Sequence, residues 1–159
     1  MTLNSFRIIL KQMATWFGVG FLRPAPGTWG TLAAVPLAIL CVYAGLAFHL
    51  TVCLILFPLS ILAAEVYEQD KGEHDCSEIV VDEVLGYLVT VVGMPLSWQT
   101  FLIGFFVFRL LDIWKPLFIG YLDQKVKGGT GTVVDDVAAG LIGNLGLQMI
   151  LKYSNILGA

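Results

Sequence analysis

Charged residues are scarce in this chain of 159 residues: they make up 13% of it, whereas 57% is hydrophobic and the mean hydropathy is +0.82. A typical soluble domain has roughly 25% charged residues, so the composition argues against an ordinary soluble protein. No charged residue occurs from Pro24 to Ala64. This stretch is about twice as long as the roughly 20 residues that one membrane crossing needs. The composition therefore predicts an integral membrane protein.

The chain also lacks the motifs that cysteine and basic residues form in other protein classes. Its three cysteines, Cys41, Cys53 and Cys76, are odd in number and have no Cys-x-x-Cys spacing, which argues against a disulfide framework and a zinc site. No basic stripe is interleaved with aromatic residues, so we expect no nucleic-acid partner. The bilayer is the partner that the composition predicts.

Interruptions in the uncharged runs divide the chain into helices. Glycine breaks the first run near residues 44–49, where we expect His49 to be an interfacial turn residue. Gly93 and Pro95 interrupt the run Val84–Phe108, so that one helix ends and another begins. We therefore predict an all-α fold, a polytopic membrane helix bundle that forms one domain over residues 1–159. We expect about five short transmembrane helices, near residues 29–46, 50–66, 80–94, 97–115 and 134–152.

The N-terminal segment has an amphipathic pattern. Apolar residues recur there at steps of four, three and four, opposite two basic residues and a threonine, which predicts an interfacial helix over residues 5–18. A secretory signal peptide is the alternative, but Lys11 and Gln12 break its apolar core and no Ala-x-Ala site follows. The apolar residues are Phe6, Leu10, Met13 and Phe17, and the polar ones are Arg7, Lys11 and Thr15.

Nearly all charges fall on one side of the predicted bundle. Five spans place eight of the nine Lys and Arg residues, including Lys125 and Lys127, on one face and only Lys152 on the other. The positive-inside rule makes that face cytoplasmic. All twelve acidic residues lie on it too. Because the uncharged parts of the last three spans are too short for a core of roughly 30 Å, we expect charged residues within the helix ends.

Ionisable groups at such a depth are costly unless they are paired or bound to metal, so a functional site is the leading interpretation and structural salt bridges are the alternative. Two similar segments, 80–84 and 133–137, each carry an acidic pair: Asp82 with Glu83, and Asp135 with Asp136. Favourable interaction with helix N-termini would also explain either pair alone. Together with Asp112, the pairs form a carboxylate set without convergent His or Cys, which favours Mg²⁺, or Mn²⁺.

Candidate phosphate-binding groups accompany the acids. Arg109, Asp112 and Lys115 are spaced by three, so they share a helical face that suits a metal-bound phosphate, although a local ion pair is the simpler alternative. Two glycine-threonine turns precede helices on the charged side and supply the further candidates Thr28, Gly129 and Thr130. Such turns also serve only to start helices. His74 is either a proton donor or, as we expect, a solvated loop histidine.

Four segments together closely resemble the bacterial phosphatidylglycerophosphatase A family: residues 24–31, 79–86, 108–116 and 128–140. They occur in the family's order and spacing and cover almost the whole chain. The resemblance implies a Mg²⁺-dependent, multi-pass enzyme of the bacterial inner (cytoplasmic) membrane whose active site faces the cytoplasm. Its implied reaction converts the phospholipid substrate phosphatidylglycerophosphate to phosphatidylglycerol and inorganic phosphate.

Matching positions assign the candidate roles. Asp82, Glu83, Asp112 and Asp136 are the catalytic candidates, the same four with Asp135 are the metal ligands, and Arg109 and Lys115 bind the phosphate. A divalent-cation transporter or binding module is the alternative, but it predicts acids along the depth of the helices, where the chain has none. A lipid phosphotransferase would carry an Asp-Gly-x2-Ala-Arg signature, which is missing. The sequence leaves the oligomeric state open.

Overall fold

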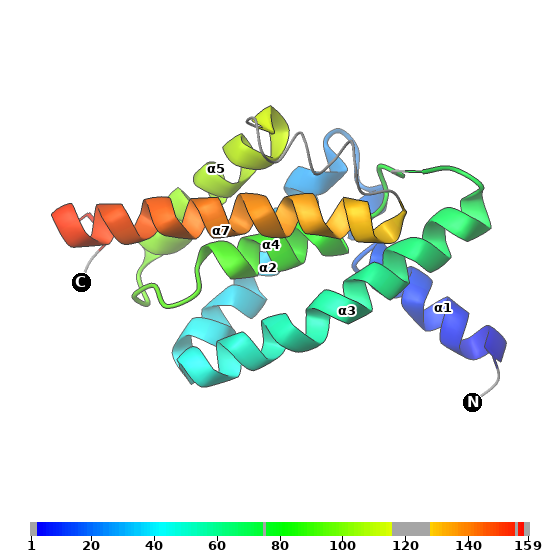
Figure 1. Cartoon of the computed structure of the whole chain (residues 1–159), viewed down its shortest axis with the longest axis horizontal. Helices are drawn as coiled ribbons and strands as arrows, with labels where there is room; N and C mark the ends of the chain where they lie inside the picture. Colours follow the sequence, from blue (N-terminus) through cyan, green and yellow to red (C-terminus); the bar gives the residue numbers. More distant parts are fainter. Residues whose placement is uncertain (1–2, 75, 116–127, 155, 158–159) are drawn as a thin grey trace.

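The computed structural model describes residues 3–74, 76–115, 128–154 and 156–157, and within these ranges it contains six α-helices, one short 3-10 helix and no strand (Figure 1). The predicted all-α class is confirmed. Lys125 and Lys127 lie outside the described residues. The helices are α1 (Leu3–Ala14), η1 (Val19–Phe21), α2 (Pro26–Ala44), α3 (Leu46–Lys71), α4 (Val81–Thr90), α5 (Trp98–Trp114) and α7 (Gly129–Tyr153).

Three of these helices, α2, α3 and α7, are long and apolar enough to cross a membrane. The other two predicted spans correspond to α4 and α5, which have 10 and 17 residues. At 1.5 Å per residue, α4 extends only about 15 Å, roughly half of the hydrocarbon core. The described residues thus contain three helices that could cross a membrane, and about five spans remain a prediction. Helix α4 ends early because the chain turns at Val91–Gly93, where Gly93 has a φ of +70°.

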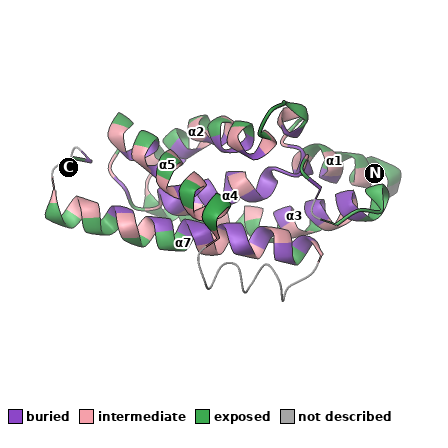
Figure 2. Cartoon of the chain, turned by 90° about the horizontal axis from the view of Figure 1, so that it is seen from above, coloured by how far each residue is buried: buried purple, intermediate pink, exposed green. Residues whose placement is uncertain are grey.

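Helix α4 occupies the centre of the bundle. Eight of its ten residues are buried, and it packs against α2, α3, α5 and α7. Figure 2 shows the buried residues on α4 and on the faces of neighbouring helices, with exposed residues on their outer sides. Apolar outer faces suit a lipid surrounding.

Glycines bring α4 and α7 into close contact. A Cβ atom added at Gly140 would overlap the carbonyl oxygen of Gly86, and one added at Gly86 would overlap the ring of Phe108 and the carbonyl oxygen of Asp136. Small residues of this kind allow helix backbones to approach each other inside a membrane protein. The contact places the acidic pair of α7 beside that of α4.

The turn between α2 and α3 lies where it was expected, but the interpretation of His49 as an interfacial turn residue is wrong. Gly45 alone separates the two helices, with a φ of +99°. His49 therefore falls in the first turn of α3, is 1% exposed, and its Nε2 lies 3.1 Å from the carbonyl oxygen of Leu88. It joins α3 to α4 inside the bundle.

Helix α1 ends at Ala14, earlier than the predicted 5–18, because the chain turns at Trp16 and Phe17, both with positive φ. Of its predicted apolar stripe, Leu10 is buried while Phe6 and Phe17 are exposed. Its basic residues Arg7 and Lys11 both pair with Asp70 at the end of α3. The helix is thus fixed to α3 by charge and by Leu10, and its position at the membrane interface remains a prediction.

The segment between α3 and α4 is tied back to α3. Nζ of Lys71 donates to Oε1 of Glu78 at 2.9 Å, and this hydrogen bond holds the pKa of Glu78 below its usual value of 4.5. Both side chains lie partly in solvent, so the contribution of the pair to stability is small. A lowered carboxyl pKa means that this contribution is present above pH 4.5 and is lost as the pH falls further.

Candidate active site

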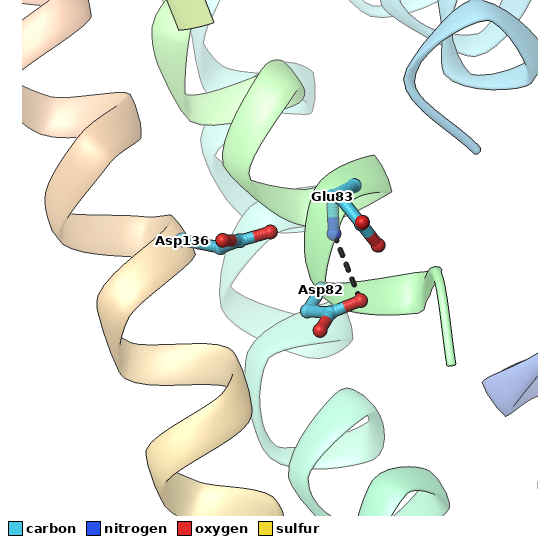
Figure 3. A group of neighbouring side chains, drawn as sticks. All are labelled: Asp82, Glu83 and Asp136. Atoms are coloured by element: carbon cyan, nitrogen blue, oxygen red, sulfur yellow. Dashed lines mark hydrogen bonds between the residues drawn. The ribbon is translucent and has the colours of Figure 1, made fainter. Parts of the chain in front are cut away.

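The two acidic pairs meet between α4 and α7. Asp82 and Glu83 lie in the first turn of α4, and Asp136 points toward them from α7 (Figure 3). One carboxylate oxygen from each of the three residues lies within 4.8 Å of the others. The predicted convergence of the two segments is therefore present in the fold.

Each pair has the same local hydrogen bond. Oδ1 of Asp82 accepts from the backbone N–H of Glu83, and Oδ1 of Asp135 accepts from the backbone N–H of Asp136, both at 3.0 Å. Only the first pair lies in the first turn of its helix, because α7 begins at Gly129. Interaction with a helix N-terminus thus does not explain Asp135 and Asp136.

Two cations lie among the acids. Nη1 of Arg109 donates to Oδ2 of Asp112 at 2.5 Å and lies 3.6 Å from Oε1 of Glu83. Nζ of Lys115 donates to Oδ2 of Asp135 at 2.6 Å. Asp112 and Asp135, expected as metal ligands, therefore each hold a cation in place.

These charged groups line one cavity of about 240 Å³. It receives side chains from α4, α5 and α7, and it is bounded by the start of α2 and the segment before α4. Its lining residues are Ala25, Pro26, Gly27, Cys76, Ser77, Ile79, Asp82, Glu83, Arg109, Asp112, Lys115, Thr132, Asp135 and Asp136.

The donor set of the cavity fits a hard divalent cation. Five carboxylates face two cationic groups, and burying such an excess of negative charge is costly unless a cation compensates it. Within the described part of the chain, Oε2 of Glu83 and Oδ2 of Asp136 are buried and have no hydrogen-bond partner. Such oxygens are the ligands that Mg²⁺ prefers. Nε of Arg109 is likewise buried with no partner there.

Three predicted phosphate-binding residues lie apart from this cavity. Thr28, Gly129 and Thr130 do not line it. The backbone N–H of Gly129 donates to Oε2 of Glu65 at 2.9 Å, so a carboxylate of α3 occupies the start of α7. His74 is about half exposed, as expected of a loop histidine, and its Nδ1 lies 3.0 Å from Oε1 of Glu68.

Two neighbours of these residues line the cavity instead. Thr132 precedes Asp135 by three and Asp136 by four, so it shares their helical face. Predicting a helix instead of a turn over residues 129–132 would have identified it. Gly27 lies where an added Cβ would overlap the carboxylate of Glu83 and come close to Arg109. The glycine lets α2 begin against the site.

Comparison with known proteins identifies the family. A family model described as Phosphatidylglycerophosphatase A matches residues 12–151. The chain belongs to this family. It is therefore a phosphatase of phospholipid metabolism, and the resemblance of its four motif segments is confirmed.

Individual relatives align with this chain over most of their length. A phosphatidylglycerophosphatase A of Haemophilus influenzae is 38% identical over 134 residues, covering 83% of this chain and 82% of its own. Its Escherichia coli counterpart is 36% identical over 131 residues, covering 82% and 76%. A Bacteroides thetaiotaomicron protein provisionally named phosphatidylinositol-3-phosphatase is 36% identical over 137 residues, covering 81% and 85%. No solved structure gives a significant match.

Proposed function

We propose that this phosphatase hydrolyses phosphatidylglycerophosphate to phosphatidylglycerol and inorganic phosphate, with Mg²⁺ bound in the acidic cavity. The whole chain acts as one membrane domain, and the cavity opens at the cytoplasmic face of a bacterial inner membrane. The observation that carries the proposal is the converging group Asp82, Glu83 and Asp136, which lies in the same cavity as the guanidinium of Arg109. Within the described residues, Oε2 of Glu83 and Oδ2 of Asp136 are buried there without a hydrogen-bond partner.

Asp82, Glu83 and Asp136 would hold the metal. Bound there, Mg²⁺ supplies Lewis-acid polarisation of the phosphate and of a water molecule. A carboxylate oxygen of Glu83 or Asp136 that does not contact the metal would accept the proton of the attacking water. Both roles need carboxylates that no internal hydrogen bond consumes, which is the state of Oε2 of Glu83 and Oδ2 of Asp136 among the described residues.

Arg109 and Lys115 bind the phosphate oxygens and stabilise the charge that develops on them. Asp112 and Asp135 orient these two cations through the ion pairs described above. Nε of Arg109 has no hydrogen-bond partner among the described residues, so the guanidinium keeps a donor for a phosphate oxygen besides the Nη1 that donates to Asp112.

The helix lengths support a cytoplasmic site without requiring five full crossings. Helices α4 and α5 form a hairpin whose two outer ends, at Asp82 and Asp112, line the same cavity. The hairpin therefore returns to the charged face whether or not it reaches the far side. With α2, α3 and α7 as complete spans, six of the described basic residues gather on one face and Lys152 lies on the other, as the positive-inside rule requires for the cytoplasm.

Phosphate release from phosphatidylglycerophosphate tests the proposal. We expect the purified protein to release phosphate with Mg²⁺ and not with a chelator, and Asp82→Asn and Asp136→Asn to lose at least 100-fold in rate. Each change removes a formal charge and an anionic ligand from a buried group while keeping the side-chain size. Glu73→Gln is the matched control, because Glu73 is exposed and does not line the cavity. Undiminished release by the two Asn variants would overturn the assignment.

A further inference from the structure

An apolar hollow of about 350 Å³ lies between α2 and α5. Leu32 and Val35 of α2 form one side of it, and Trp98, Leu102 and Phe106 of α5 form much of the other. The three α5 residues recur at steps of four, so they lie along one face of that helix. All three are exposed in the isolated chain. The described residues that line the hollow are all apolar.

A second hollow of about 560 Å³ continues along α5 toward the charged end, lined by Phe106, Arg109, Leu110, Ile113 and Trp114. Phe106 lines both hollows, and Arg109 lines the second hollow and the acidic cavity. The three concave surfaces are therefore consecutive. They lead from the carboxylates, past Arg109, to Trp98, and we call the two apolar hollows together the α5 groove.

The length of the α5 groove suits an acyl chain. From Arg109 to Trp98 the helix rises roughly 16 Å at 1.5 Å per residue. One leaflet of the hydrocarbon core is about 15 Å deep, half of roughly 30 Å. A lipid whose phosphate lies beside Arg109 would have chains that can follow α5 for about the depth of its own leaflet.

We propose that the α5 groove binds the acyl chains of the phosphatidylglycerophosphate substrate while its terminal phosphate lies in the acidic cavity. This inference rests on the proposed function and adds where the lipid tail is bound. The argument is continuity: Arg109 borders both the polar cavity and the apolar groove, so the rest of the lipid can continue from the cavity along α5. Substrate enters sideways from the bilayer, between α2 and α5, and needs no complete withdrawal into water.

Chain-length dependence tests the proposal. We expect Leu102→Trp, which places bulk in the groove, to lower kcat/KM at least tenfold for a phosphatidylglycerophosphate with 16-carbon chains. The same variant should stay within twofold of the wild type for the analogue with 6-carbon chains, which also shows that it is folded. Leu54→Trp is the matched control, because Leu54 is an exposed leucine of α3 outside the groove. It should alter neither substrate.

An equal effect of Leu102→Trp on both chain lengths, or no effect on either, would overturn the groove assignment while leaving the proposed function intact. If the wild type releases phosphate from neither lipid, the proposed function itself fails, and the groove assignment fails with it. The two failures are thus distinguishable.

Photolabelling separates substrate chains from bulk lipid. Two lipids with the same diazirine-bearing chain are compared in micelles, one with the glycerophosphate head group and one with phosphocholine. We expect the first to label residues 98–106 at least several-fold more strongly than the second, and both to label α3 equally. Equal labelling of residues 98–106 would mean that any lipid covers this face. No labelling there with either lipid would mean that another protein surface covers it. Both results would overturn the proposal.

Discussion

At the scale of single residues, Arg109 connects the parts of the site. Its Nη1 contacts Asp112 and lies near Glu83, its Nε has no partner in the described part of the chain, and it borders the apolar groove. A guanidinium offers several donors in a fixed plane, whereas an ammonium is a point charge. The site therefore depends on the shape of this group as well as on its charge.

Arg109→Lys should lower the rate of phosphate release by about 10–100-fold, equivalent to roughly 1.4–2.7 kcal/mol of transition-state stabilisation. Lysine keeps the charge but cannot hold Asp112 and contact the phosphate with a second donor at the same time. Arg23→Lys is the control, since Arg23 is exposed and outside the cavity. Equal rates for the two variants would show that Arg109 supplies charge alone.

The acids could be predicted from the sequence because charges within helix ends are costly, and two similar segments carry them. Which acids would bind the metal and which hold a basic side chain could not be predicted. Asp112 and Asp135 form ion pairs with Arg109 and Lys115, and these pairs depend on where the two basic side chains lie. Thr132 was missed because residues 128–132 were interpreted as a turn, whereas the first turns of α7 begin at Gly129.

At the scale of elements, the contact between α4 and α7 decides whether the acidic pairs meet. Gly140 lies against the backbone of Gly86, whereas Gly146, further along α7, has nothing within 4 Å of an added Cβ atom. The two glycines share a helix and differ only in their neighbours. They form a natural pair of test positions.

Gly140→Ala should destabilise the protein by about 1–3 kcal/mol, because the added methyl group forces α7 away from α4, and it should also lower activity by separating Asp136 from Asp82 and Glu83. Gly146→Ala should be neutral or slightly stabilising, as alanine favours helix by up to about 1 kcal/mol. Thermal unfolding in detergent with parallel phosphate-release assays measures both. A tolerated Gly140→Ala would mean that the close helix contact is not needed.

The presence of the long helices could be predicted from the uncharged runs. The position of His49 and the length of α4 could not, because they depend on where the turns fall. His49 was expected in a turn because it is titratable, yet the single-residue turn at Gly45 moves it into α3, where Leu88 satisfies its ring nitrogen. Helix α4 stops after ten residues because the turn begins at Val91, before the Gly–Pro interruption that marked its end in the sequence.

At the scale of the whole molecule, five carboxylates collect in one cavity at helix ends, while α2, α3 and α5 expose many large apolar side chains. The N-terminus of α4, the C-terminal end of α5 and the first turns of α7 all reach the same cavity. Such an arrangement brings a lipid phosphate, held at the depth of the head groups, to buried carboxylates and two cations while its chains stay in the bilayer. The fold thus matches a phosphatase whose substrate is a membrane lipid.

Metal binding by the purified protein tests the central claim most directly. Mn²⁺, which replaces Mg²⁺ at oxygen sites, is titrated into the full chain in detergent without substrate and followed by electron paramagnetic resonance. The account predicts saturable binding by the wild type and by Glu73→Gln, and at least tenfold weaker binding by Asp136→Asn, because Asp136 supplies one of three converging carboxylates. Binding of equal affinity by Asp136→Asn and the wild type would contradict a metal site between α4 and α7.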